Sequence, residues 1–274
     1  MKKYFLISSI LAVIMLIVGG IGLLITGEAF RGISFGYNGI QFKGATKSFR
    51  EEIDIANSNV KFNLNVPNTK VEIHTGNNDN IIVNCSYNND KFIIDNNGDT
   101  INIKREESYG SISIFDFSTE GGELEIIVPE SLIGNYIVEA TNGSIEINNI
   151  KANNIDIESR NGNFEIEDII VDGEVKIDVN NGRIVAEDIS AIAVNFETTN
   201  GFVNIENINT DFIRVGTTNG FIKAYNCYSK DVILKTTNGA ITLENEDKNY
   251  QIENLDVNTT NGKENINASY KNRK

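Results

Sequence analysis

The chain has 274 residues, a hydrophobic content of 40% and a formal net charge of −14. This length and composition suffice for a sizeable buried core, and they disfavour a disordered chain. Two prolines, no tryptophan and two cysteines exclude a collagen-like chain and a disulfide-rich scaffold, and the acidic charge disfavours nucleic acid as a partner.

Segment 1–27 is predicted to be a transmembrane anchor. No charged residue occurs from Tyr4 to Gly27, a run of 24 residues, which as a helix would extend roughly 36 Å and cross a hydrocarbon core of about 30 Å. Lys2 and Lys3 precede the run and Glu28 follows it. The positive-inside rule therefore predicts a single-pass protein of the cell membrane, with a cytoplasmic N-terminus and an extracytoplasmic C-terminal domain.

A cleaved signal peptide is the alternative interpretation of this segment. Residues 25–27 have the small side chains of a passable cleavage site, although the apolar run exceeds the usual core of about 7–15 residues in a signal peptide. The sequence leaves this alternative open.

Residues 28–50 lack sustained periodicity and are predicted to be a tether that could include a first edge strand. In residues 51–129, apolar and polar residues alternate in short runs separated by Asn, Asp and Gly, which predicts half-buried strands. The apolar positions are Val60, Phe62, Leu64, Val71, Ile73, Ile81, Val83, Cys85, Ile101, Ile103, Ile112, Ile114, Leu124, Ile126 and Val128. Cys85 fits this core pattern, and His74, the only histidine, has no companion ligands for a metal.

Residues 130–274 contain a repeat marked by the dipeptide Asn-Gly. The dipeptide occurs at 142, 161, 181, 200, 219, 238 and 261, with spacings of 19, 20, 19, 19, 19 and 23 residues. Apolar residues recur two, four and seven positions after each of the first five glycines, and a second apolar pair follows at about 12 and 14. Each repeat therefore contains two short strands, and such units bury their apolar faces only by stacking.

The predicted fold is all-β: a parallel β-solenoid with rungs of 19–20 residues. We expect the Asn-Gly pairs to form one corner, where glycine allows a positive φ and the asparagines form a hydrogen-bonded ladder at the strand spacing of about 4.8 Å. The predicted turn glycines are Gly143, Gly162, Gly182, Gly201, Gly220, Gly239 and Gly262. Cys227 occupies a core position of its rung, and the polar end from Lys263 to Lys274 is expected to cap the solenoid.

The chain resembles a bacterial family of unknown function known as putative adhesins or LiaG-like proteins. The resemblance is carried by the segments 124–129 (LEIIVP) and 136–143 (YIVEATNG) and by the Asn-Gly repeats that follow, and it extends over about residues 50–265. It implies a membrane-tethered extracytoplasmic β domain, linked in several relatives to envelope sensing, with no established enzymatic activity.

An aromatic cluster is the best candidate binding surface. Phe202 and Phe221 occupy the same outward position of adjacent rungs, and Tyr225 and Tyr228 follow nearby. An exposed aromatic column could bind a glycan or a protein partner. The alternative is a stack that only stabilises the sheet, which would contribute up to about 1 kcal/mol per pair.

Columns of carboxylates are the second feature of the outward positions. Glu167, Glu187 and Glu206 align on successive rungs, and we weigh a weak Ca²⁺ site against an ordinary solvated face. We favour the solvated face, because the motifs of calcium-binding repeats are missing. The sequence shows no zinc spacing, phosphate loop or nucleophile elbow, so we predict no metal, no cofactor and no enzymatic activity.

The leading functional hypothesis is a cell-envelope binding, adhesin-like or sensing scaffold whose partner is a cell-wall polymer or a membrane protein. Two alternatives remain. One is an extracytoplasmic carbohydrate-active β-helix enzyme, motivated by the acidic columns beside the aromatic residues. The other is a structural protein that assembles end to end.

Overall fold

The computed structural model describes residues 33–36, 39–42, 47–55, 58–87, 91–106 and 121–274. All regular secondary structure in these ranges is β-strand, and none of it is a helix long and apolar enough to cross a membrane. The predicted anchor at 1–27 lies outside the described residues, as do the expected core positions Ile112 and Ile114.

The strands fall into two units that are described separately. The first unit contains an antiparallel hairpin of β1 (Ile33–Gly36) and β2 (Gly39–Phe42). The second unit contains all the others: β3 (Lys47–Ile53), β4 (Asn59–Asn65), β5 (Thr69–Gly76), β6 (Ile81–Tyr87), β7 (Lys91–Asn96), β8 (Thr100–Glu106), β9 (Gly122–Pro129), β10 (Ile133–Asn148), β11 (Lys151–Val171), β12 (Glu174–Ser190), β13 (Ala193–Asn200), β14 (Val203–Asn219), β15 (Ile222–Asn238), β16 (Ile241–Glu244), β17 (Gln251–Asn261), β18 (Glu264–Asn267) and β19 (Ser269–Arg273).

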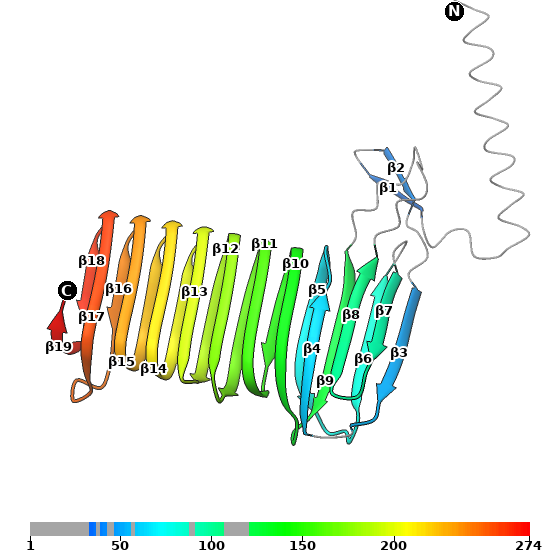
Figure 1. The fold of residues 1–274 in the computed structure, drawn as a ribbon. Helices are drawn as coiled ribbons and strands as arrows, with labels where there is room; N and C mark the ends of the chain where they lie inside the picture. Colours follow the sequence, from blue (N-terminus) through cyan, green and yellow to red (C-terminus); the bar gives the residue numbers. More distant parts are fainter. Residues whose placement is uncertain (1–32, 37–38, 43–46, 56–57, 88–90, 107–120) are drawn as a thin grey trace, which may run out of the picture. The chain divides into compact units, whose positions relative to one another are not determined.

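Strands β10 to β19 stack as successive parallel rungs (Figure 1). Several strands run through the Asn-Gly corner without a break, so that β11 alone spans the two predicted short strands and the corner between them. Segments before the corner, such as 155–159, form what we call the pre-corner face, and segments after it, such as 164–167, form the post-corner face. The predicted parallel β-solenoid is confirmed for these rungs.

The core lies between the two faces and follows the predicted columns. In the rung of β11, Ile155 and Ile157 on the pre-corner side and Phe164, Ile166 and Ile169 on the post-corner side are all at most 1% exposed. The equivalent positions of the neighbouring rungs are buried in the same way. Burial of each such side chain contributes about 1.5–3 kcal/mol, so the repeated columns stabilise the whole stack.

The N-terminal strands differ from a simple series of parallel rungs. β4 and β8 extend the pre-corner face in parallel, and β5 and β9 extend the post-corner face in the same way. In contrast, β3 pairs antiparallel with β6, β6 with β9 and β7 with β8. Alternating polarity predicts which side of a strand is buried but not the direction of its neighbour, so the expectation of parallel pairing was wrong for these three strands.

The first strand of this unit, β3, begins at Lys47, inside the segment expected to be a tether that could include an edge strand. It lies at the edge of the post-corner face, where β6 is its only partner among the described strands. β3 carries Lys47, Arg50, Glu51 and Glu52, and such charged side chains on an edge strand discourage pairing with other chains.

Candidate binding surface

The seven predicted turn glycines all lie at the Asn-Gly corner. A Cβ atom added to any of them would overlap a backbone carbonyl oxygen of the preceding rung, so the rungs approach too closely for any other residue. Four of them, Gly143, Gly162, Gly182 and Gly239, also have a positive φ. The predicted conformational reason therefore holds at these four, and close approach requires glycine at all seven.

The expected asparagine ladder is confirmed along this corner. Each asparagine donates its side-chain Nδ2–H to the Oδ1 of the asparagine on the preceding rung, at distances of 2.6–2.8 Å. The ladder begins on Asn68 and continues through Asn142 to Asn261. Because each interior amide both donates and accepts, the ladder aligns the rungs along the whole corner.

A second corner lies six positions after each of the first five glycines. Asn149, Asp168, Asp188, Asn207 and Asn226 have φ values of 49–53° there. Asn and Asp tolerate this left-handed conformation better than other non-glycine residues. Their recurrence in five successive repeats is a sequence signal of this corner, which the apolar pattern alone does not reveal.

Phe202 and Phe221 lie on the post-corner face directly after the ladder. Their rings stack with centroids 4.8 Å apart and an interplanar angle of 8°. Phe221 is 38% exposed, and the Lys223 ammonium lies 5.3 Å from its ring centroid. The two phenylalanines therefore form a partly exposed flat surface with a cation beside it, a combination suited to stacking against a ring or an apolar group.

The two tyrosines of the predicted cluster lie apart from this stack. Tyr225 lies on β15, which begins directly after Phe221, but it pairs in register with Glu206 and Glu244, so it interrupts the acidic column. Tyr228 lies beyond the second corner and contacts Tyr250 edge to face, with ring centroids 5.2 Å apart. The structure thus brings together Phe202 and Phe221, and it places Tyr225 and Tyr228 in other surroundings.

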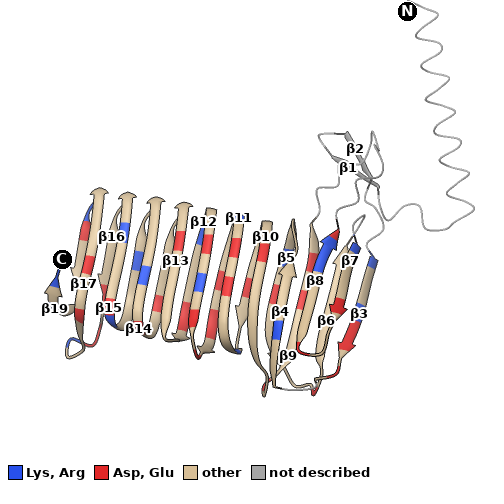
Figure 2. Cartoon of the chain, viewed as in Figure 1, with Lys and Arg blue, Asp and Glu red and all other residues tan. Residues whose placement is uncertain are grey.

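The acidic column aligns Glu167, Glu187 and Glu206 on neighbouring rungs. Figure 2 shows acidic positions recurring along β10, β11 and β12. Partial burial, followed by repulsion from Glu206, raises the pKa of the Glu187 carboxyl. Within the described ranges, no group of three or more His, Cys, Asp and Glu side chains could hold a metal ion.

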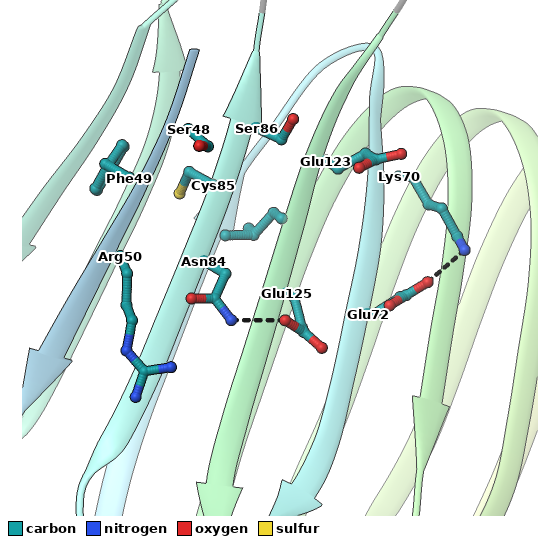
Figure 3. A pocket seen from close by; sticks show the side chains of 11 residues that line it. Ser48, Phe49, Arg50, Lys70, Glu72, Asn84, Cys85, Ser86, Glu123 and Glu125 are labelled. Carbon is teal, nitrogen blue, oxygen red and sulfur yellow. Dashed lines mark hydrogen bonds and ion pairs between the residues drawn. The ribbon is translucent and has the colours of Figure 1, made fainter. Parts of the chain in front are cut away.

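A hollow of about 560 Å³ lies farther along the post-corner face, over β3, β6, β9 and β5 (Figure 3). Glu125 accepts a hydrogen bond from Asn84 at 2.6 Å and contacts His74 Nε2 at 3.1 Å. These two partners hold the pKa of Glu125 below its ordinary value. Glu72 bonds to the Lys70 ammonium. Asn84 and His74 therefore stabilise the charged form of Glu125, whereas the general acid of a glycosidase is a protonated carboxylic acid.

Both cysteines are free thiols in the core, as expected from the apolar pattern. Burial raises the pKa of the Cys85 thiol to about 12, and burial also raises the pKa of Cys227. Neither group is a reactive thiolate at neutral pH.

Solved structures of three bacterial proteins show some similarity to this chain. A "putative cell adhesion protein" from Clostridium sporogenes and a "putative adhesin" from Parabacteroides distasonis each have a TM-score of 0.41 and 12% identity. They cover 84% of this chain, and the matches span 100% and 98% of their own chains. A "putative adhesin" from Bacteroides fragilis has a TM-score of 0.37 and 12% identity, covering 85% of this chain and 100% of its own.

A comparison with curated proteins finds no match. The family comparison does find one, because the model of the family described as Toastrack DUF4097 matches residues 59–274. This range includes β4 to β19, with both corners and the aromatic stack. The chain therefore belongs to the Toastrack DUF4097 family, in agreement with the resemblance noted in its sequence.

Proposed function

We propose that this protein is a non-enzymatic binding scaffold of the cell envelope, anchored by residues 1–27 with its solenoid outside the membrane. The uncharged run from Tyr4 to Gly27, with lysines before it and Glu28 after it, supports the anchor and its orientation. The partner is a cell-wall polymer or another membrane protein. A rigid stack of rungs suits this role, because it presents side chains in fixed columns.

The stacked pair Phe202 and Phe221 is the observation that carries the binding proposal. Outward aromatic rings are uncommon here, and Phe221 is one of four large hydrophobic residues that are exposed within the described ranges. Glu125 in the hollow of Figure 3 supports the non-enzymatic part, since Asn84 and His74 stabilise its charged form.

The test is capture by purified cell wall and by solubilised envelope membranes, using the full chain in detergent micelles. The Phe202→Ala/Phe221→Ala variant should lose capture, because the stacking surface is removed. Tyr270→Ala is the matched control, since Tyr270 is 39% exposed, close to the 38% of Phe221, but lies on β19. Equal capture by all three proteins would refute this surface.

The anchor has a separate test. The full chain should remain in the membrane after alkaline extraction, and protease added outside spheroplasts should degrade the solenoid. Recovery of the chain in the soluble fraction would contradict the anchor without affecting the binding surface.

A further inference from the structure

A second hollow, of about 270 Å³, lies on the pre-corner face at the rungs of β13, β14, β15 and β17. It forms where one outward column lacks a side chain. In register, this column contains Asp178, Glu197, Gly216 and Lys235 on successive rungs. Gly216 thus lies between two long charged side chains, and the carboxylate of Glu197 extends over it.

Neither the backbone conformation at residue 216 nor a nearby backbone atom requires glycine there. Its φ is outside the left-handed region, and a Cβ atom there would overlap only the carboxylate end of Glu197, which is flexible. At the corner glycines, in contrast, an added Cβ atom would overlap backbone atoms of the preceding rung. A glycine inside a strand often marks a place where a ligand approaches the backbone closely.

Threonine hydroxyls line the hollow next to Gly216. Thr218, Thr237 and Thr260 precede the ladder asparagines of three successive rungs, line the hollow and are exposed. Their hydroxyls have no hydrogen-bond partner within the described ranges. The inner threonines differ, since Thr217 and Thr236 donate to the carbonyl oxygens of Gly201 and Gly220. The outer hydroxyls therefore form a row of available donors and acceptors at the rung spacing of about 4.8 Å.

The charges around the hollow are balanced, although the chain carries a net charge of −14. Arg214 Nε donates to Glu197 Oε1 at 2.9 Å, and Lys235 Nζ lies 2.7 Å from Asp256 Oδ2. A guanidinium has five N–H donors and a carboxylate about four acceptor sites, so the Arg214–Glu197 pair retains free groups for a ligand. Such a lining favours a neutral, hydroxyl-rich ligand over a strongly charged one.

We propose that this hollow binds one sugar residue of a neutral, linear glycan that runs along the solenoid axis. An extended β-linked glycan repeats its rings at a length close to the rung spacing, so successive sugars can meet successive threonines. The Arg214–Glu197 pair, whose carboxylate lies over Gly216, supplies hydrogen bonds to ring hydroxyls. This site is separate from the Phe202–Phe221 surface.

The test is calorimetric titration of the full chain in detergent micelles with cellohexaose and chitohexaose, with polyphosphate as the charged comparison. The native protein should bind at least one hexasaccharide. Thr218→Val/Thr237→Val should bind it roughly tenfold more weakly, because two hydroxyls are lost while shape is kept. Thr141→Val is the control, since Thr141 precedes the ladder asparagine of the first repeat, far along the stack from the hollow.

Gly216→Val is the second variant. Valine favours strands, so the thermal midpoint should not fall. Its side chain would displace the Glu197 carboxylate into the hollow and should abolish hexasaccharide binding. Unchanged binding by either hollow variant, stronger binding of polyphosphate, or no binding of both hexasaccharides would overturn the proposal. Phe202→Ala/Phe221→Ala should bind the hexasaccharide normally, so failure of the envelope-capture test and failure of this one are distinguishable.

Discussion

The N-terminal part of the solenoid (residues 47–129) and the repeat region (residues 130–274) bury the same kind of alternating strands in different ways. In the repeat region every rung passes through an Asn-Gly corner, and the strands on each face are parallel. In the N-terminal part the corner at Asn68 ends the ladder, and β3, β6 and β7 pair antiparallel. The antiparallel pairs lie beyond the end of the ladder, where β4–β8 and β5–β9 remain parallel, so the ladder accompanies the uniformly parallel stack without being required for every parallel pair.

The two ends of the stack are consequently closed by different means. At the N-terminal end, the parallel stack is followed by antiparallel strands, and the charged strand β3 lies at the edge of the post-corner face. At the C-terminal end, the side chain of buried Asn245 accepts from the backbone N–H of Cys227 and donates to its carbonyl oxygen, and polar β18 and β19 follow. Both ends limit pairing with further chains.

The largest difference between the two regions is expected in how much stability is lost when a glycine is replaced. Gly220→Ala should lower the free energy of unfolding by more than about 4 kcal/mol, because the new Cβ overlaps the Gly201 carbonyl oxygen. Gly98→Ala, in the β7–β8 turn, should cost only about 1–2 kcal/mol, since its φ of 79° is strained for alanine but the space is open. Urea denaturation of both variants measures this, and equal losses would contradict the role of the corner.

The asparagine ladder should contribute less to the free energy of unfolding than the corner glycines do. Its contribution should also differ between the middle and the end of the ladder. Asn219→Ala removes one hydrogen bond to Asn200 and one from Asn238, so it should cost about 1 kcal/mol of unfolding free energy. Asn261→Ala removes only the bond to Asn238 and should cost about half as much. Chemical denaturation compares the two, and a larger loss for Asn261→Ala would refute a cumulative ladder.

A buried hydroxyl at the junction of the two regions allows a substitution that should not lower stability. Tyr136 stacks on Phe62, with centroids 4.9 Å apart, and its hydroxyl is buried without a hydrogen-bond partner within the described ranges. Tyr136→Phe removes this group and should leave stability unchanged or raise it by up to about 1 kcal/mol. A clear loss in thermal midpoint would show that the hydroxyl is satisfied in solution.

The smallest expected effects concern pH, and they differ in sign between the regions. Hydrogen bonds from Asn84 and His74 lower the pKa of Glu125 from its ordinary 4.5, so its stabilisation is complete above that value and disappears as pH falls. Burial and neighbouring carboxylates raise the pKa of Glu187, so it destabilises at neutral pH and this penalty is relieved on acidification.

Thermal midpoints of Glu125→Gln and Glu187→Gln at several pH values measure this contrast. At neutral pH, Glu125→Gln should be less stable than the native protein and Glu187→Gln slightly more stable. Both differences should shrink in acid. Because both side chains are partly exposed, solvent screening keeps the effects small, and shifts of the same sign would refute the contrast.

Much of the fold could be read from particular residues in the sequence. The seven glycines, the ladder asparagines and the core position of Cys227 follow from the repeat alone, since a unit of 19–20 residues has few ways to stack. The aromatic pair was also visible, because Phe202 and Phe221 occupy equivalent positions. The sequence did not reveal that Tyr225 aligns with the acidic column, or that the second corner at Asn226 separates Tyr228 from the aromatic pair.

By itself, then, the sequence determined the rung length, the buried columns and the corner at which glycine is required, because these depend on local periodicity and close backbone approach. Only the tertiary structure decided the antiparallel N-terminal strands and the hollow at Gly216. The hollow combines side chains from rungs 19 to 23 residues apart. Its shape depends on how those side chains lie across neighbouring strands, which no single repeat encodes.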